Sequence, residues 1–167
     1  MRSTMTVLFS LLTVTQLLAA QLEVSAPPEE LKLNEVYKKH ISANGYPVVA
    51  TDKVDDYALK EAAYLVNMLL AKRPDVREAM IGSGSRLIVM AHNEFTTDVP
   101  EHSKLKPKDF WDARARGLGG SEHDPVCSCG EENLLCYEGD PYPTENILIH
   151  ARGRGNRTVD QNQTARA

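Results

Sequence analysis

The chain has 167 residues, of which 42% are hydrophobic, and a formal net charge of −4. This length suits a single domain. Residues 151–167 hold four Arg and one Asp, which leaves a net charge of −8 on residues 21–150. An acidic body of this kind argues against nucleic acid as the main partner.

The first twenty residues have the features of a secretory signal peptide. Arg2 precedes an apolar run from Thr6 to Leu18, and small residues follow at Ala19 and Ala20. The run is short for a bilayer span, so an uncleaved membrane anchor is the weaker alternative. We therefore expect cleavage near Ala20, a secreted or periplasmic protein, and no stable membrane anchor after cleavage.

Between the signal peptide and residue 91, the spacing of apolar residues predicts helices and strands in alternation. Residues 29–41 predict a short amphipathic helix that Asn44-Gly45 stops, and residues 46–51 predict a strand. Residues 52–73 predict the main helix, and residues 74–81 a second one that begins at a proline. Residues 86–91 are apolar enough for a central strand. On the main helix we expect one buried stripe, widened by Tyr57, Tyr64 and Met68, and made of Ala58, Ala62, Leu65 and Leu69.

From His92 to Tyr142 the sequence predicts mostly loop, with a short helix at 107–116. A loop of this length is uncommon in a compact domain and is often functional. A last helix is expected to begin with Thr144 as its N-cap. Residues 151–167 have too few apolar side chains to form a core, and we expect them to be disordered or aberrant, for example the product of a frameshift.

The chain has three cysteines, Cys127, Cys129 and Cys136. Export makes a disulfide possible. It could join Cys129 to Cys136, or Cys127 to Cys129 in a tighter ring, and the sequence does not decide between the two pairings. An odd number leaves one thiol that could link two chains into a dimer. A zinc site that joins His123 to the cysteines is a weaker reading, because the spacing is unusual for zinc.

Three further histidines are candidate site residues: His40, His92 and His102. His92 follows the strand at 86–91 and could line a cleft, although a surface position is the simpler interpretation. His40 and His102 lie in polar sequence and are expected to be solvated.

Long stretches of the chain resemble a family of secreted bacterial zinc metallopeptidase-like proteins. The segment "GLGGSEHDPVCSCGEENLLCYEGDPYPTENILIH" is similar to the sequence that leads into the active helix of that family. The segments "VDDYALKEAAYLVNMLLAKRPDVREAMIGSGSRLIVMAHNEFTTDVPE" and "KPKDFWDARARGLGG" are similar to it as well. The family belongs to the zincins and is similar to the catalytic domain of anthrax lethal factor. The resemblance covers roughly residues 27–150.

The resemblance implies a zinc site that this sequence does not complete. In the family "ENILIH" continues into H-E-x-x-H, in which both histidines bind zinc and the glutamate is the general base. His150 matches the first ligand, but Ala151 and Arg154 occupy the positions of the glutamate and the second histidine. His150 is therefore expected to be a relic of a zinc ligand. No catalytic residue is assigned, and zinc, the cofactor of the intact family, is not expected to bind.

The sequence as a whole predicts an α/β (α+β) fold: the upper half of a zincin-like metallopeptidase domain, with a small mixed sheet and two or three helices. Residues 1–20 are the signal peptide, residues 21–150 an incomplete zincin-like domain, and residues 151–167 the tail. The expected function is that of a truncated member of a family that hydrolyses peptide bonds in peptide or protein substrates, inactive as this chain. The alternative is a secreted, non-catalytic binding or structural protein.

Overall fold

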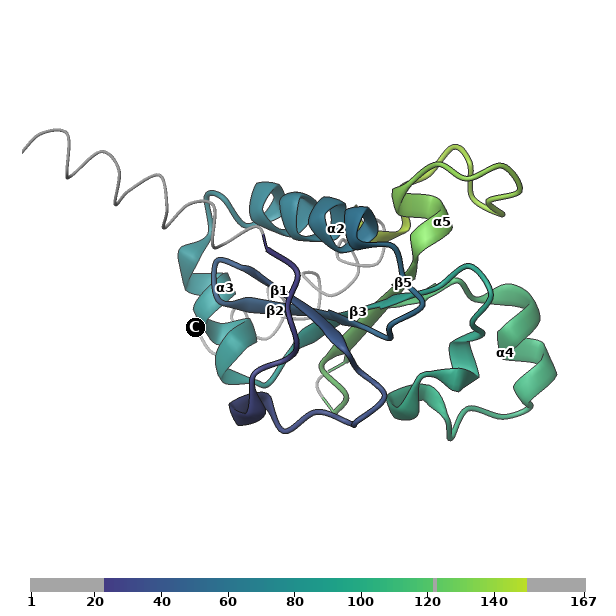
Figure 1. The fold of residues 1–167 in the computed structure, drawn as a ribbon, viewed down its shortest axis with the longest axis horizontal. Helices are drawn as coiled ribbons and strands as arrows, with labels where there is room; N and C mark the ends of the chain where they lie inside the picture. Colours follow the sequence, from purple (N-terminus) through teal and green to yellow (C-terminus); the bar gives the residue numbers. More distant parts are fainter. Residues whose placement is uncertain (1–22, 122, 150–167) are drawn as a thin grey trace, which may run out of the picture.

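The structure, a computed structural model, describes residues 23–121 and 123–149. They form an α+β fold around a mixed five-stranded sheet with the strand order β1-β2-β3-β5-β4 (Figure 1). The expected fold class of a small mixed sheet with packed helices is therefore confirmed. The predicted signal peptide and the tail at 151–167 lie outside the described residues.

The sheet begins with a hairpin where the sequence pattern predicted a helix. β1 (Lys39–Ala43) pairs antiparallel with β2 (Tyr46–Ala50). The two residues between them, Asn44 and Gly45, both have positive φ angles, 52° and 88°. Such a pair favours the two-residue turn whose twist matches a hairpin. The helix expected at 29–41 is wrong: within this range the helical part is one 3-10 turn, η1 (Glu29–Leu31).

Three parallel strands form the centre of the sheet. β3 (Arg86–Met90) lies between β2 and β5 (Val126–Gly130) and is parallel to both, as expected for the apolar run at 86–91. The short strand β4 (Gly117–Leu118) pairs antiparallel with β5 at the edge. The prediction that residues 92–142 are mostly loop is wrong for β5, whose five residues are all buried.

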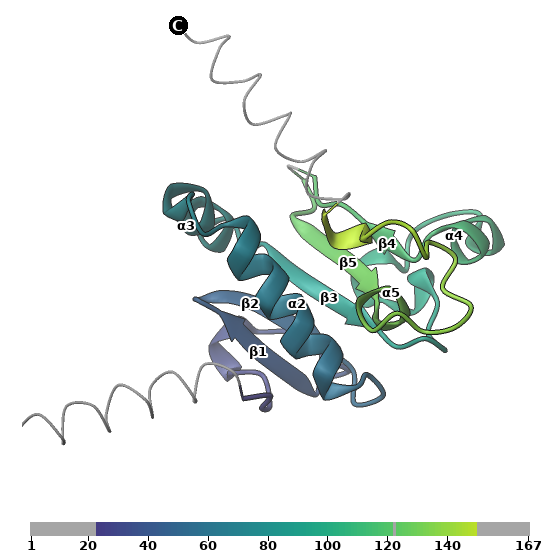
Figure 2. The ribbon, with the colours of Figure 1, turned by 90° about the horizontal axis from the view of Figure 1, so that it is seen from above.

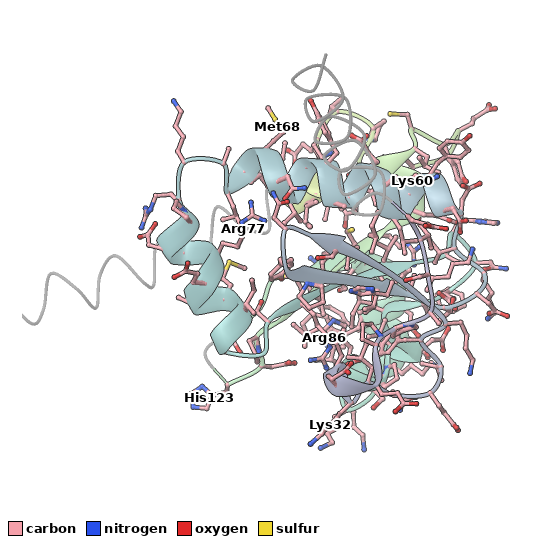
Figure 3. The ribbon with its side chains drawn as sticks, turned by 60° about the vertical axis from the view of Figure 1, so that its left-hand side comes forward. Lys32, Lys60, Met68, Arg77, Arg86 and His123 are labelled. Carbon is pink, nitrogen blue, oxygen red and sulfur yellow. The ribbon has the colours of Figure 1, made fainter. Side chains whose placement is uncertain are left out.

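The main helix, α2 (Asp56–Leu69), lies within the predicted range of 52–73 and begins four residues later than that range. The Asp55 carboxylate accepts a 2.8 Å hydrogen bond from the backbone N–H of Tyr57. The predicted buried face is rotated from the real one, because alanines allow the helix to approach the sheet closely. Of the side chains expected to be buried, Tyr57, Tyr64 and Met68 are more than half exposed, and Leu69 is 37% exposed. Met68 lies on the outer side of α2 (Figure 3). The buried face consists of Ala58, Leu59, Ala62, Ala63 and Val66.

The remaining helices are short. α3 (Pro74–Gly82) and α4 (Lys108–Arg114) fall where the sequence predicted them. The 3-10 turns η2 (Thr96–Asp98) and η3 (Pro100–His102) precede α4, and α5 (Glu131–Leu134) directly follows β5.

The hydrophobic core occupies both faces of the sheet. α2 lies across one face, and Figure 2 shows it passing over the strands. On the other face a smaller cluster contains Val49, Ile88 and Met90 from the strands, with Tyr37 and Val99 from the segments that cover them. In the part of the chain that the structure describes, no helix combines the length and apolar character that a bilayer crossing requires.

The last described residues begin a helix later than expected. Residues 147–149 are helical, and the Asn146 side chain accepts a 3.2 Å hydrogen bond from the backbone N–H of Ile149. Asn146 therefore takes the capping role that the sequence analysis gave to Thr144. Leu148 is buried, and His150 lies outside the described residues.

Candidate functional site

Three buried glutamates gather where the parallel strands end. Glu94, Glu131 and Glu132 are 8%, 2% and 6% exposed, and all three follow the carboxyl ends of β3 or β5. Ligands of open α/β sheets bind beyond the carboxyl ends of the strands. We therefore take the carboxyl ends of β3 and β5, where these three glutamates lie, as the candidate site.

Glu94 is held in place by neutral donors. One carboxylate oxygen accepts a 2.8 Å hydrogen bond from the Thr51 hydroxyl, and the other accepts a 2.9 Å bond from the backbone N–H of Ala91. The Lys53 ammonium lies 3.5 Å from the first oxygen and is 58% exposed. The carboxylate thus bridges the ends of β2 and β3.

Arg116 and Glu132 form a buried ion pair with two contacts. The guanidinium donates to the two carboxylate oxygens at 2.6 and 2.9 Å. It also donates to the backbone carbonyl of Ala91 at 2.9 Å, and to that of Glu94. Two-point pairs of this kind fix orientation as well as charge. Arg116 therefore ties the turn after β3 to the start of α5.

Glu131 orients the ring of His92. One carboxylate oxygen lies 2.9 Å from His92 Nδ1 and accepts a 2.9 Å hydrogen bond from the backbone N–H of the same residue. The other accepts a 2.8 Å bond from the backbone N–H of Asp55, at the start of α2. When His92 is neutral, this contact places the proton on Nδ1 and leaves Nε2 as an acceptor.

The His92 side chain is 61% exposed, which agrees with the predicted surface position. The ring of Tyr137 lies edge-on to it, with 6.0 Å between the ring centres. An imidazole held in this way can accept a proton or offer one lone pair to a metal. Glu131 was not predicted as a site residue. Its sequence signal is a pair of adjacent glutamates after Gly130, and this pair lies in a segment that was expected to be loop.

Asn133 organises the segment that leads to residue 149. Its side-chain N–H groups donate to the Asp140 carboxylate at 2.7 Å and to the backbone carbonyls of Tyr142 and Glu145 at 3.1 and 2.8 Å. Its side-chain oxygen accepts a 2.8 Å bond from the backbone N–H of Ile147. One buried amide therefore shapes the loop and positions the first turn of the helix.

The cysteines do not come together with His123. Cys127 and Cys129 are buried within β5, whereas Cys136 is exposed beyond α5, and all three thiols are free in the structure. His123 lies in the loop ahead of β5, at the opposite end of that strand from Cys136, and points outward (Figure 3). The pairing of the thiols stays a prediction.

The predictions for two other histidines have different outcomes. His102 was expected to be solvated, and this is wrong: it is 5% exposed, and its Nε2 lies 3.0 Å from the Ser128 hydroxyl. Burial lowers the pKa of His102 below its ordinary value. His40 is half-buried on β1, and burial lowers its pKa as well.

Comparison with family models, with curated proteins and with solved structures finds no match to this chain. Within residues 23–121 and 123–149, no group of three or more His, Cys, Asp or Glu side chains is arranged to hold a metal ion.

Proposed function

We propose that this chain is a member of the zincin-type metallopeptidase-like family that does not hydrolyse peptides itself. The observation that carries the proposal is the helix start at 147–149, which leads directly to His150 in the sequence. The Asn133 amide and the Asn146 cap place this start at a defined position. A helix that must present a metal ligand needs such support.

The neighbour of this helix start also supports the proposal. A side chain on Gly117 in β4 would collide with Cγ2 of Ile147. The helix therefore lies against the edge strand of the sheet. An extended peptide can pair with a strand edge, and in this place it would run beside the helix start at 147–149.

The inactivity follows from the residues after His150. A catalytic zinc takes three protein ligands, and the activation of its water needs a base. Ala151 stands at the position of the base and cannot act as one, and Arg154 stands at the position of the second histidine and cannot bind zinc. A single neutral imidazole binds zinc weakly, and a nearby arginine lowers the affinity further. The proposal includes secretion after signal cleavage, no resident zinc, and the loss of protease activity.

The test is a zinc and peptidase measurement on the purified mature chain. We expect substoichiometric zinc by mass spectrometry and background hydrolysis of unfolded casein, both unchanged in His150→Ala. The double variant Ala151→Glu, Arg154→His should bind zinc more tightly and still leave casein intact, because the completed motif supplies only two of the three protein ligands that a catalytic zinc takes. Stoichiometric zinc with hydrolysis in the unaltered chain would refute the proposal.

A second candidate function is that of a secreted binding protein without catalysis. The exposed stripe of Tyr57, Tyr64 and Met68 on α2 favours it, since large apolar side chains gathered on one helix face often mark contact surfaces. Under this reading Tyr64→Glu should abolish partner binding without lowering the thermal midpoint, whereas His150→Ala should leave binding unchanged.

A further inference from the structure

A cavity of about 370 Å³ lies over β3, on the sheet face opposite α2. Three segments wall it: residues 36–38, residues 51–53 and residues 98–100. Ile88, Met90 and Val99 give it an apolar floor. Its volume falls in the range of small-molecule pockets, and its place at the carboxyl ends of β2 and β3 is where sheets of this kind bind ligands.

The polar end of the cavity is the Glu94 carboxylate. The side chain is 9% exposed, yet its close contacts are the neutral donors Thr51 and Ala91. Burial of a carboxylate is costly unless a cation compensates it. Two other carboxylates have a guanidinium in close contact, unlike Glu94: Glu101, which is partly buried, lies 2.5 Å from Arg86, and the buried Glu132 lies 2.6 Å from Arg116.

The Lys53 ammonium lies near the Glu94 carboxylate but is too far away to form a close ion pair with it. Its Nζ lies 3.5 Å from the carboxylate oxygen, beyond the 2.7–2.9 Å of a charge-assisted hydrogen bond, and the side chain is largely in water. An exposed ion pair of this length contributes little. An ammonium bound in the cavity could therefore approach the Glu94 carboxylate more closely than Lys53 does. Thr51 and Ala91 already hold this carboxylate in a fixed orientation.

We propose that this cavity binds a small organic cation, a primary ammonium on an aliphatic stem. The ammonium donates to Glu94 and Thr51 and displaces Lys53 toward solvent. The stem lies on Ile88, Met90 and Val99. The net charge of −8 on residues 21–150 favours the approach of a cation. This inference is independent of the proposed loss of peptidase activity, because the cavity lies over β2 and β3, away from the edge strand β4.

The experiment measures the binding of two matched probes by calorimetry in 0.15 M NaCl, where long-range attraction to an acidic surface is screened. The probes are Nα-acetyl-lysine amide and Nα-acetyl-norleucine amide, which share the stem and differ in the ammonium. We expect saturable binding of the lysine probe, with an affinity at least tenfold above that of the norleucine probe. Equal affinities would overturn the proposal.

Variants separate the cavity from general charge effects. Glu94→Gln should lower the affinity for the lysine probe at least tenfold, whereas Asp75→Asn, a matched loss of one carboxylate on α3, should leave it unchanged. Lys53→Gln removes the competing ammonium, so it should raise the affinity severalfold. Since Lys53 is exposed, this variant decides the matter even if Glu94→Gln fails to fold. A weaker affinity in Lys53→Gln would overturn the proposal.

Discussion

The side-chain oxygen of Asn133 accepts a 2.8 Å hydrogen bond from the backbone N–H of Ile147. This bond joins α5 to the start of the helix that precedes His150, across fourteen residues of sequence. The two N–H groups of the same side chain are shared among three further acceptors in the loop between them. The position of the helix start thus depends on one amide that is 7% exposed.

Replacement of this amide should release the loop. Asn133→Asp keeps the shape but turns the donor end into an acceptor that faces the Asp140 carboxylate and two carbonyls. We expect a loss of about 1–3 kcal/mol in the free energy of unfolding, which is typical for buried polar groups left unsatisfied. Amide hydrogen exchange at Ile147 should accelerate.

The control is Asn34→Asp. Asn34 is exposed, and its side-chain oxygen accepts from the backbone N–H of Val36, a role that an aspartate keeps. Unchanged exchange at Ile147 in Asn133→Asp, with the fold intact, would show that the amide does not control the helix start.

The buried face of α2 can be tested by a pair of truncations. Leu59 is fully buried and Tyr64 is 55% exposed, although the sequence pattern assigned Tyr64 to the buried stripe and left Leu59 out. Leu59→Ala should cost about 2–5 kcal/mol, because it leaves a cavity in the core. Tyr64→Ala should change the stability by no more than about 0.5 kcal/mol. Urea unfolding of both variants measures the difference, and a reversed order would mean that the helix presents its other face.

The sequence predicted elements whose signals are local, and missed those that depend on distant partners. α2, α3 and β3 carry strong periodic or continuous apolar patterns and capping residues, and these were placed correctly. Residues 39–43 carry a lysine, a histidine and a serine, so a helical spacing of Ile41 with Leu31 and Val36 was equally plausible. Pairing with β2 decided between the two, and Asn44-Gly45 was the signal for it.

β5 was missed for a related reason. Its sequence, Val-Cys-Ser-Cys-Gly, has one branched aliphatic residue and no flanking periodicity. It is a strand because β3 and β4 pair with both of its edges. The candidate site was hidden for the same reason, since Glu131 gains its contact with His92, and Glu132 its contact with Arg116, only when β5 pairs beside β3.

The cysteines should differ sharply in reactivity. Burial raises the pKa of the Cys129 thiol to about 12, and Cys127 is also buried, whereas Cys136 is exposed. Since the thiolate is the reactive form, iodoacetamide at pH 8 should label Cys136 in the folded protein and reach the other two only after unfolding. Mass spectrometry of tryptic peptides gives the sites.

The same thiol is the one available for a dimer. Under oxidising conditions Cys136→Ser should remove any disulfide-linked dimer on a non-reducing gel, and Cys129→Ser should leave it. A dimer that persists in Cys136→Ser would show that a strand cysteine becomes accessible.

The stability of the fold should fall on mild acidification. Burial lowers the pKa of His102, and weaker attraction from Asp124 and Glu101 opposes this. The folded protein therefore keeps His102 neutral at a pH at which the unfolded chain, with a histidine pKa of about 6.5, already takes up a proton. Since the unfolded state then binds more protons, stability is fully present above about pH 6.5 and declines as the pH falls below it, by at most about 1.4 kcal/mol per pH unit for one histidine.

His102→Gln should reduce this decline, because glutamine does not titrate and can still face the Ser128 hydroxyl. Urea midpoints of the unaltered chain and the variant at pH 7.5 and pH 5.5 measure the effect, and His40, whose pKa burial also lowers, accounts for part of the remainder. His123→Gln is the matched control, since His123 is exposed in the loop ahead of β5 and its replacement should leave the decline as it is. If His102→Gln loses as much stability between the two pH values as the unaltered chain, His102 does not contribute to the decline, and the prediction is wrong.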